Sequence, residues 1–549
     1  MQLNSAIERL LKVRGISAAD DVAEFLSEKP QKTYNPFLLP NMEEGVDLIL
    51  SAIEDEKKIC IYGDYDSDGV TSVALLRDVL KELGADVTYY IPSRFDDGYG
   101  LNSSALEKIK GAGVSLVITV DCGCTSVDEV EHAKSIGLDI MVTDHHTPKE
   151  EVPDCIVIDP LLEGSEYPFK YLAGVGVAFK LAQALVESTG ASKEILTRNL
   201  DLLGIGTIVD IVPLIDENRT FAKYGLRALK VTERAGIKAL LDKLGIKRNE
   251  ITSRTISYII GPHINAAGRV DNATLAARLL QTEDYERALS LTDELIGCNM
   301  KRKSLQDELQ KACYESIDDE TIDKEKFILI SPKSAHEGII GIVAGKLKED
   351  YSVPVLITTP IGDGIHKGTG RSPSGVNLFK LLTSHSELFT RLGGHSAACG
   401  FSIPEENLPK LREILKIEME ELIRENPDAL DSTPEAEIIM NPEEITKDFM
   451  AQQKLLEPFG KDNDEPMVGV ELRPFEIARM GDGRFIRFNG KLGSGSSIRG
   501  VDFRKADEHE GILKRAEQEN SSVTAVGNLG IQTWNDKEYI QLVLKAIKS

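Results

Sequence analysis

The sequence predicts an α/β protein in which a parallel sheet is followed by a second α/β unit and then by a small all-β barrel. From Lys58 onward, short β-branched runs alternate with helical segments, which is typical of βαβ units on a parallel sheet. Residues 274–316 have the polar pattern of one long charged helix that could join two domains. After Asp431 the pattern changes to short strands, which favours a barrel of about five strands.

Each element can be placed along the chain. The first 50 residues are expected to be helical, because Ile7, Leu10 and Leu11 recur at helical spacing. The strands of the parallel sheet are expected at 59–62, 87–91, 115–120, 139–143 and 155–158. The second α/β unit is expected from a strand at 327–331, a helix from about 338 and a strand at 354–359. The barrel strands are expected near 468–475, 485–488, 523–527 and 539–545.

The composition is that of a folded protein with several domains. Its 549 residues exceed what one core usually organises, and 41% of them are apolar and 28% charged. The seven cysteines are scattered without paired zinc-ligand spacing, which indicates a reducing cytoplasm. The sequence shows no export signal, and no apolar run approaches the roughly 18 residues of a membrane span, so we expect neither export nor a membrane partner.

The net charge of −25 would ordinarily argue against a polyanionic partner, because net repulsion opposes encounter. One segment departs from this balance. Residues 471–505 carry eight basic residues against four acidic ones, and four phenylalanines lie between them. Basic side chains interleaved with aromatic ones suit a groove that follows phosphates and stacks bases, although buried phenylalanines beside solvated charges give the same pattern.

Acidic residues and histidines follow the ends of three expected strands. Asp64, Asp66 and Asp68 follow the first strand, Asp121 follows the third, and the triplet 144–146, Asp-His-His, follows the fourth. Because the carboxyl ends of parallel strands meet at one edge of the sheet, these residues are expected to converge in one crevice. The sequence therefore predicts a ligand or metal site at this edge.

The residue types indicate which ion the site would hold. Carboxylates and imidazoles without thiolates favour manganese or magnesium over structural zinc. The run Asp64–Gly69 could also be a solvated acidic turn, whereas a calcium loop lacks its required Glu. Adjacent histidines can supply one metal ligand and one proton donor or phosphate contact; the alternative is a pair of surface histidines.

These residues resemble the motifs of the DHH phosphoesterase superfamily. The first three motifs correspond to 64–69, 120–123 and 144–146, and the fourth, 206–213, nominates Asp210 as a metal ligand. Further segments resemble the RecJ family of single-strand exonucleases; they lie at 172–179, 264–269, 336–341, 393–400 and 458–463. The resemblance implies a helical segment at 1–50, a DHH domain at 51–230, a helical connector at 231–320, a DHHA1 domain at 321–430 and an OB-type barrel at 431–549.

The resemblance also implies an activity, namely two-metal hydrolysis of single-stranded DNA from its 5′ end to nucleoside 5′-monophosphates in repair and recombination. The implied cofactors are two divalent ions, with Mn²⁺ preferred over Mg²⁺. Implied metal ligands are Asp64, Asp66, Asp68, Asp121, His145 and Asp210, and implied catalytic residues are His146, Arg269 and Asp64. Implied substrate contacts are Arg94, Tyr99, Thr369, Arg371, Gly393, Gly394 and His395. Single-strand-binding protein and a RecQ-type helicase are the implied partners besides single-stranded DNA with a 5′ end.

Some alternatives stay open at this point. Arg94 and Arg371 would suit a terminal phosphate, but either could form a surface ion pair, and Tyr99 could stack on a base or pack. A phosphodiesterase for short RNA or cyclic dinucleotides would use the same metals, although the barrel argues against it. A non-catalytic replication scaffold is disfavoured because every ligand type is present. Departures from the RecJ pattern occur at His263, Ala335 and 462–464.

Overall fold

The computed structural model describes residues 3–95, 100–333, 335–503, 505–534 and 537–548. The chain forms two compact units, the first of which combines Met1–Tyr90, Gly100–Gly261 and Thr433–Ser549, and the second Ile91–Tyr99 and Pro262–Ser432. All seven cysteines are free thiols. Within the described residues, no helix is both long enough and apolar enough to cross a membrane.

The first unit contains the predicted parallel sheet. Its strands are β1 (Ile59–Gly63), β2 (Val87–Tyr90), β3 (Leu116–Val120), β4 (Asp139–Thr143) and β5 (Ile156–Ile158). Their order is β2-β1-β3-β4-β5 and every neighbouring pair is parallel. The α/β class predicted from the alternation of strands and helices is thus confirmed for this unit.

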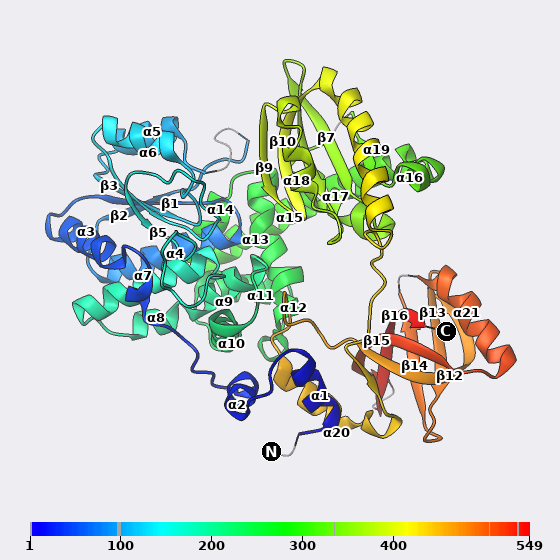
Figure 1. Cartoon of the computed structure of the whole chain (residues 1–549). Helices are drawn as coiled ribbons and strands as arrows, with labels where there is room; N and C mark the ends of the chain where they lie inside the picture. Colours follow the sequence, from blue (N-terminus) through cyan, green and yellow to red (C-terminus); the bar gives the residue numbers. More distant parts are fainter. Residues whose placement is uncertain (1–2, 96–99, 334, 504, 535–536, 549) are drawn as a thin grey trace. The chain divides into compact units, whose positions relative to one another are not determined.

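Helices cover both faces of this sheet (Figure 1). On one face, α5 (Ser103–Gly111) and α6 (Val127–Ser135) bury an apolar cluster against β1, β3 and β4. On the other, α4 (Ser67–Glu82) packs on β1, and α7 (Gly174–Thr189) packs on β3 and β4. The remaining helices of this region are α3 (Met42–Glu54), α8 (Glu194–Arg198), α9 (Leu200–Val209), α10 (Asp216–Val231), α11 (Ala235–Lys243) and α12 (Ser253–Thr255).

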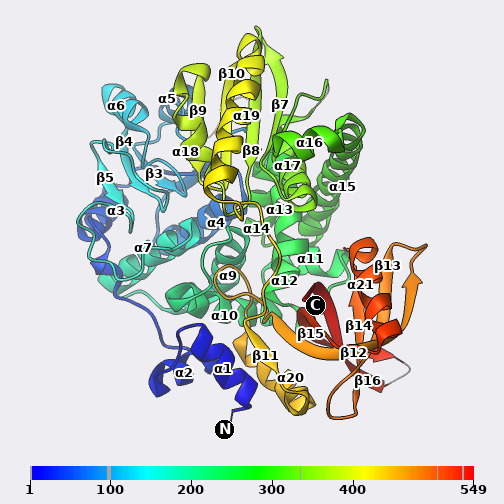
Figure 2. The same cartoon turned by 45° about the vertical axis from the view of Figure 1, so that its right-hand side comes forward.

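The second unit is a mixed sheet with helices on both faces (Figure 2). The strands, in the order β6-β7-β8-β10-β9, are β6 (Ile328–Ile330), β7 (Val355–Gly362), β8 (Ile365–Arg371), β10 (Ala398–Pro404) and β9 (Arg391–His395). One apolar cluster joins the sheet to α18 (Leu378–Thr383) and α19 (Leu408–Glu425). The opposite cluster joins it to α15 (Tyr285–Ser316) and α17 (Glu337–Tyr351).

The prediction of one unbroken helix over 274–316 is wrong in detail. The structure has α14 (Thr274–Gln281) and α15, separated by three residues. Asp284 ends the break, since its side chain accepts hydrogen bonds from the N–H groups of Glu286 and Arg287 and thereby begins a new helix. The unit is completed by α13 (Gly261–Val270) and α16 (Asp319–Glu325).

The C-terminal part of the first unit is the predicted barrel. Its strands are β11 (Ile438–Met440), β12 (Val468–Met480), β13 (Phe485–Lys491), β14 (Ser497–Asp502), β15 (Val523–Trp534) and β16 (Lys537–Lys548). Strands β12, β13, β14, β16 and β15 follow one another, and pairing of β15 back to β12 closes the sheet. Helices α20 (Lys447–Gln453) and α21 (Ala506–Glu519) accompany the strands.

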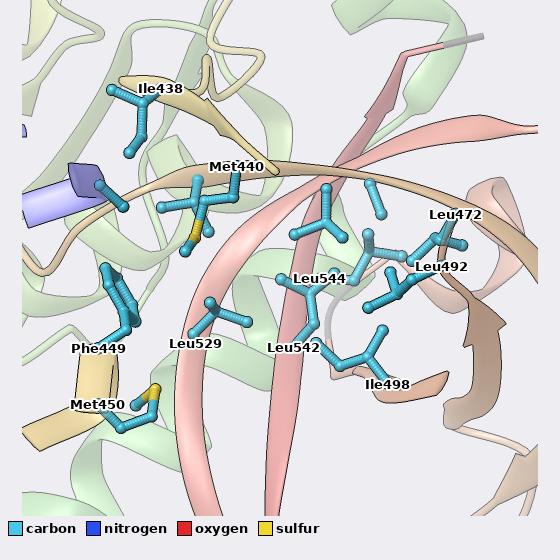
Figure 3. Close-up of a cluster of buried hydrophobic side chains, with 14 of the residues drawn as sticks. Ile438, Met440, Phe449, Met450, Leu472, Leu492, Ile498, Leu529, Leu542 and Leu544 are labelled. Carbon is cyan, nitrogen blue, oxygen red and sulfur yellow. The ribbon is translucent and has the colours of Figure 1, made fainter. Parts of the chain in front are cut away.

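Figure 3 shows buried side chains in the interior of this barrel; Leu529, Leu542 and Leu544 belong to the same apolar cluster as Phe449 from α20. Helix α1 (Ser5–Val13) belongs to the same core, because its buried Ile7, Leu10 and Leu11 join this cluster. The next helix, α2 (Ala19–Leu26), also packs its partly buried apolar side chains there. The N-terminal helical segment therefore stabilises a part of the fold that lies more than 400 residues later in the sequence.

Candidate metal centre

Acidic residues follow the carboxyl ends of four strands at the same edge of the sheet, because these strands end in register. Gly63 pairs with Val120, Val120 with Thr143, and Thr143 with Ile158. The following residues are Asp64, Asp121, Asp144 and Asp159. Asp121 has a φ of 61°, a left-handed conformation that is uncommon for residues other than glycine. The sheet therefore delivers four carboxyl groups to the same place.

The turn from β1 into α4 adds two more carboxylates. Asp66 caps the helix, since its Oδ1 accepts hydrogen bonds from Asp68 N at 2.9 Å and Gly69 N at 3.1 Å. A Cβ on Gly69 would lie 2.4 Å from the carbonyl oxygen of Asp64, so only glycine permits this turn. The spacing of the motif thus follows from the geometry of a capped helix.

The carboxylate of Asp68 is held by the main chain of α7. Its Oδ2 accepts from Gly174 N at 2.6 Å and its Oδ1 accepts from Val175 N at 2.8 Å. A Cβ on Gly174 would lie 2.6 Å from Cβ of Asp121, so this helix begins against both acids. The segment 172–179 was singled out in the sequence, but its role as a cradle for Asp68 was missed.

His145 faces three of these carboxylates. Its Nε2 lies 3.1 Å from Asp121 Oδ1, 3.7 Å from Asp210 Oδ2 and 3.9 Å from Asp68 Oδ2. This nitrogen makes no hydrogen bond with any residue that the structure describes, although it is buried. A buried nitrogen that points at carboxylates without bonding to them is suited to a shared cation.

Asp210 reaches the cluster from the C-terminal end of α9. That end of a helix carries partial negative charge, so an acid is electrostatically unfavourable there. A Cβ on Gly206, one turn earlier, would lie 2.5 Å from Thr71 Oγ1 and 2.9 Å from Asp68 Oδ1, so a glycine is needed for α9 to pack this close. Both observations indicate that the helix is placed to bring Asp210 to the other acids.

Burial makes these charges costly. It raises the pKa of Asp68 to about 8, that of Asp210 to about 6, and that of Asp121 well above its usual value. Three overlapping sets of side chains could each hold an ion, because the ligand atoms of each set lie within 4.8 Å of one another. The first set is Asp121, His145 and His146, and the second is Asp68, His145 and Asp210. The third set is Asp64, Asp66 and Asp121. Divalent cations would neutralise this repulsion.

The donor set fits Mn²⁺ or Mg²⁺. All the ligand atoms are carboxylate oxygens or imidazole nitrogens. The nearby thiols of Cys122 and Cys124 are unsuitable as thiolate ligands, because burial raises the pKa of each well above its usual value. The six ligands expected from the sequence, together with His146, are thus brought together.

Asp144 orients the two histidines. Its Oδ1 accepts from the backbone N–H of His145 at 2.8 Å and lies 2.7 Å from Nδ1 of His146, while its Oδ2 accepts from Cys124 N at 3.0 Å. Burial lowers the pKa of His146, but the hydrogen bond and charge of Asp144 outweigh it and raise the value to about 9. Asp144 therefore favours the protonated form of His146, whose ring is about half exposed.

Asp159 was missed by sequence reasoning. It is fully buried after β5, at the same edge as Asp64, Asp121 and Asp144. Burial raises its pKa to about 7, and Asp144 adds to the shift. The available signal was its position after the fifth strand, but it stands alone before Pro160 rather than in a charged motif.

The second unit gathers three of the predicted arginines around the start of α17. Arg269 Nη1 donates to Gly338 O at 3.1 Å, and Arg94 Nε donates to Gly268 O at 3.3 Å. A Cβ on Gly341 would lie 3.0 Å from Arg371 Nη2. Cationic groups beside a helix N-terminus make a surface that favours anions.

Arg371 is held by neighbours on its own strand. Its Nη1 donates to Thr369 Oγ1 at 2.9 Å and to Gly370 O at 2.8 Å. It has no ion pair with an acid in the described part of the chain, and burial lowers its pKa. The alternative, in which Arg371 forms a surface ion pair, is therefore not observed among the described residues.

Three of the other residues predicted to contact the substrate lie together on one strand of the second sheet. Gly393, Gly394 and His395 lie exposed on β9, the edge strand of the second sheet. Gly394 has a φ of 145°, and a Cβ there would lie 2.4 Å from the carbonyl oxygen of Ala398. Tyr99 lies outside the described residues.

Comparison with known proteins agrees with this arrangement. The DHH family N-terminal domain matches residues 58–207, the DHHA1 domain 324–421 and the RecJ OB domain 436–546. The single-stranded-DNA-specific exonuclease RecJ of Bacillus subtilis is 36% identical over 550 residues, covering 99% of this chain and 68% of that protein. This chain belongs to the RecJ family. The RecJ protein of Escherichia coli is 30% identical over 526 residues, covering 91% of this chain and 89% of that one.

Solved RecJ structures share the fold. The crystal structure of Thermus thermophilus RecJ in complex with Mn²⁺ has a TM-score of 0.82 at 27% identity and covers 98% of this chain and 75% of that chain. The same protein has been solved with Mg²⁺ at a TM-score of 0.76, covering 98% and 74% of the two chains. As a RecJ family member with this acidic cluster, the chain is a metal-dependent phosphoesterase of the DHH class.

Proposed function

We propose that this chain is a single-strand-specific DNA exonuclease that degrades from the 5′ end and releases nucleoside 5′-monophosphates. The observation that carries the proposal is the convergence of Asp68, Asp121, His145 and Asp210 in a RecJ family member. We further propose that two ions bind there, with Mn²⁺ preferred over Mg²⁺. Bound ions would neutralise the phosphodiester and lower the pKa of the attacking water.

The chain's own residues divide the remaining work. Asp64, Asp66, Asp68, Asp121, His145 and Asp210 would hold the ions. His146, whose protonated form Asp144 favours, would contact the phosphate or donate a proton to the leaving oxygen. Arg269 would stabilise charge that develops on the phosphoryl group, because its guanidinium is permanently charged.

Polarity requires a group that recognises the end of the strand. We assign Arg94 and Arg371 to the terminal 5′-phosphate, with Thr369 positioning Arg371 through its hydroxyl. Gly393, Gly394 and His395, exposed on β9, would contact the sugar-phosphate backbone, and Tyr99 would stack on a base. The barrel, with its basic segment 471–505, would grip the strand beyond these contacts.

The division of labour follows the domains proposed from the sequence: a helical segment at 1–50, the DHH domain at 51–230, a helical connector at 231–320, the DHHA1 domain at 321–430 and the barrel at 431–549. Free cysteines support a reducing, cytoplasmic location. Single-strand-binding protein and a RecQ-type helicase are proposed partners in repair and recombination; co-purification of each with the catalytically inactive variant Asp121→Ala would test them.

One substrate panel separates this proposal from its rivals. The purified chain is incubated in manganese with 5′-phosphorylated single-stranded DNA, the matching duplex, a short RNA and a cyclic dinucleotide. We expect rapid release of mononucleotides from the single strand alone and none after chelation. Faster turnover of the RNA or cyclic dinucleotide would favour the phosphodiesterase alternative, and no turnover of any substrate would favour the scaffold.

A further inference from the structure

The segment 458–463, which we call the knuckle, docks onto the loop that follows Asp210. The backbone N–H of Leu214 donates to the carbonyl oxygen of Lys461 at 2.8 Å. A Cβ on Gly460 would lie 2.6 Å from Leu214 Cδ1, so glycine is needed for this close approach. The knuckle is therefore fixed directly against the loop that follows Asp210, a residue of the metal centre.

Side chains hold the knuckle in one shape. The buried amide of Asn463 donates to Leu456 O at 2.9 Å and to Pro458 O at 2.7 Å. Ser253 Oγ donates to Phe459 O at 2.7 Å. These hydrogen bonds to the backbone of the knuckle fix the position of the Lys461 main chain.

The side chain of Lys461 is exposed and lines a groove of about 830 Å³ that also contains Ile211, the residue after Asp210. Lys461 forms no side-chain hydrogen bond or ion pair within the part of the chain that the structure describes. Glu457, Asp464 and Glu465 line the groove too, but none is paired with it.

The rest of the groove suits a single polynucleotide strand. Ile211 is 66% exposed and has a φ of 61°, which is strained for a β-branched residue and is typical of functional positions. Tyr258 is 74% exposed, and the guanidinium of Arg254 lies 5.4 Å from its ring centroid. An exposed aromatic ring with cations beside it can stack a base and contact phosphates.

We propose that Lys461 contacts a backbone phosphate of the substrate strand, at a linkage beyond the scissile bond, where the strand passes along this groove beside the metal centre. An ammonium group is a compact point charge suited to a single phosphate oxygen. This inference rests on the proposed function. It adds a substrate-binding residue from the knuckle, which lies between β11 and β12 and had no assigned role.

Two variants test the charge without disturbing the knuckle, because none of the hydrogen bonds that hold the knuckle uses the side chain of Lys461. Lys461→Met keeps the aliphatic stem and removes the charge, and Lys461→Arg keeps the charge. Lys410→Met is the matched control, because Lys410 is an exposed lysine on α19 without an ion pair among the described residues. We expect only Lys461→Met to lower kcat/KM on single-stranded DNA, by about tenfold and mainly through KM.

Two further readouts separate a phosphate contact from other roles. The slope of log kcat/KM against log salt should become shallower by about one unit in Lys461→Met alone. The manganese concentration that gives half-maximal rate should not change. A shift in manganese activation with unchanged KM would overturn the proposal, because the lysine would then act on Asp210 rather than on DNA.

The contacted phosphate can be found with strands that carry one neutral methylphosphonate at the second, third, fourth or fifth linkage from the 5′ end. Release of the first nucleotide is measured in a single turnover. At one linkage the neutral group should slow the wild-type chain about tenfold and leave Lys461→Met unaffected. If the methylphosphonate and Lys461→Met lower the rate independently, so that their effects multiply at every linkage, the proposed contact is wrong. If the wild-type chain releases no nucleotide from the all-phosphate strand, it is the proposed function that fails.

Discussion

The backbone N–H of Gly174 donates to Asp68 Oδ2 at 2.6 Å, so the first turn of α7 holds a carboxylate of the metal centre by its main chain. The positive end of a helix favours the ionised acid. The same glycine lies against Asp121, where any side chain would displace the acid. Orientation of the cluster therefore depends on a residue that has no side chain of its own.

Gly174→Ala should impair the metal centre while the fold persists, because the added Cβ would lie 2.6 Å from Cβ of Asp121. We expect kcat to fall on the order of 100-fold and the manganese requirement to rise. Gly176→Ala, on the same helix, is the matched control, since its Cβ would meet Leu172 at an ordinary 3.4 Å. Equal rates for both variants would show that the start of α7 does not determine the geometry of the metal centre.

Asp210→Asn should make the metal-free protein more stable above pH 6. Burial raises the pKa of Asp210 from 3.8 to about 6, so the folded wild type loses stability as the pH rises from about 4 to about 6. The amide introduced by Asp210→Asn does not ionise, so the variant does not lose stability over this pH range. The free energy of unfolding of the variant should exceed that of the wild type by at most about 3 kcal/mol, because part of the Asp210 side chain is exposed. The difference should vanish below pH 4.

Thermal unfolding at several pH values, with chelator and then with manganese, measures this difference. Manganese should stabilise the wild type more than Asp210→Asn, since ions bind the complete site more tightly. A metal-free variant less stable than the wild type at pH 7 would mean that Asp210 stabilises the fold rather than repelling its neighbours.

Much of the metal centre follows from the sequence. Parallel strands that end in register place Asp64, Asp121 and Asp144 at one edge, and β-branched runs are enough to locate such strands. The cradle at Gly174 could not be predicted, because a main-chain hydrogen bond leaves no side-chain signature. Asp210 was nominated by resemblance alone, since an acid at a helix end is an ordinary surface feature.

Other parts of the fold depended on long-range packing. The apolar stripe of α1 predicts a buried face but does not identify its partner, which is the core around Phe449 and Leu542. Strand β14 was not predicted individually, although its existence was implied by a barrel of about five strands. The break before α15 depends on the cap made by Asp284, a short-range signal that the charged pattern of the segment obscured.

Arg371→Ala should selectively reduce the preference for a 5′-phosphorylated strand over a 5′-hydroxyl strand. Loss of a charge-assisted contact is worth about 1.5–3 kcal/mol, or roughly 10- to 150-fold. Arg371→Lys should recover little, because an ammonium group lacks the planar fork. Initial rates on the two strands give the ratio; an unchanged ratio would remove Arg371 from the phosphate pocket.

Removal of the barrel alone should yield an unstable protein, because it would expose Ile7, Leu10 and Leu11 of α1. Removal of residues 1–30 together with 433–549 should give a better-behaved core that still cleaves very short oligonucleotides but binds long strands weakly. Light scattering and activity on both lengths compare the two truncations. Equal loss of activity on short and long strands by the double truncation would show that the barrel supports catalysis itself.

The central claim is metal-dependent hydrolysis that starts at the 5′ end of a single strand. One measurement tests it: the same oligonucleotide, labelled at either end, is incubated in manganese with the wild type and with Asp121→Ala. The account predicts that the 5′ label appears at once as a mononucleotide, that the 3′ label passes through a ladder of shortening strands, and that Asp121→Ala does neither while its circular dichroism is unchanged. Immediate release of the 3′ label, or near-normal turnover by Asp121→Ala, would contradict it.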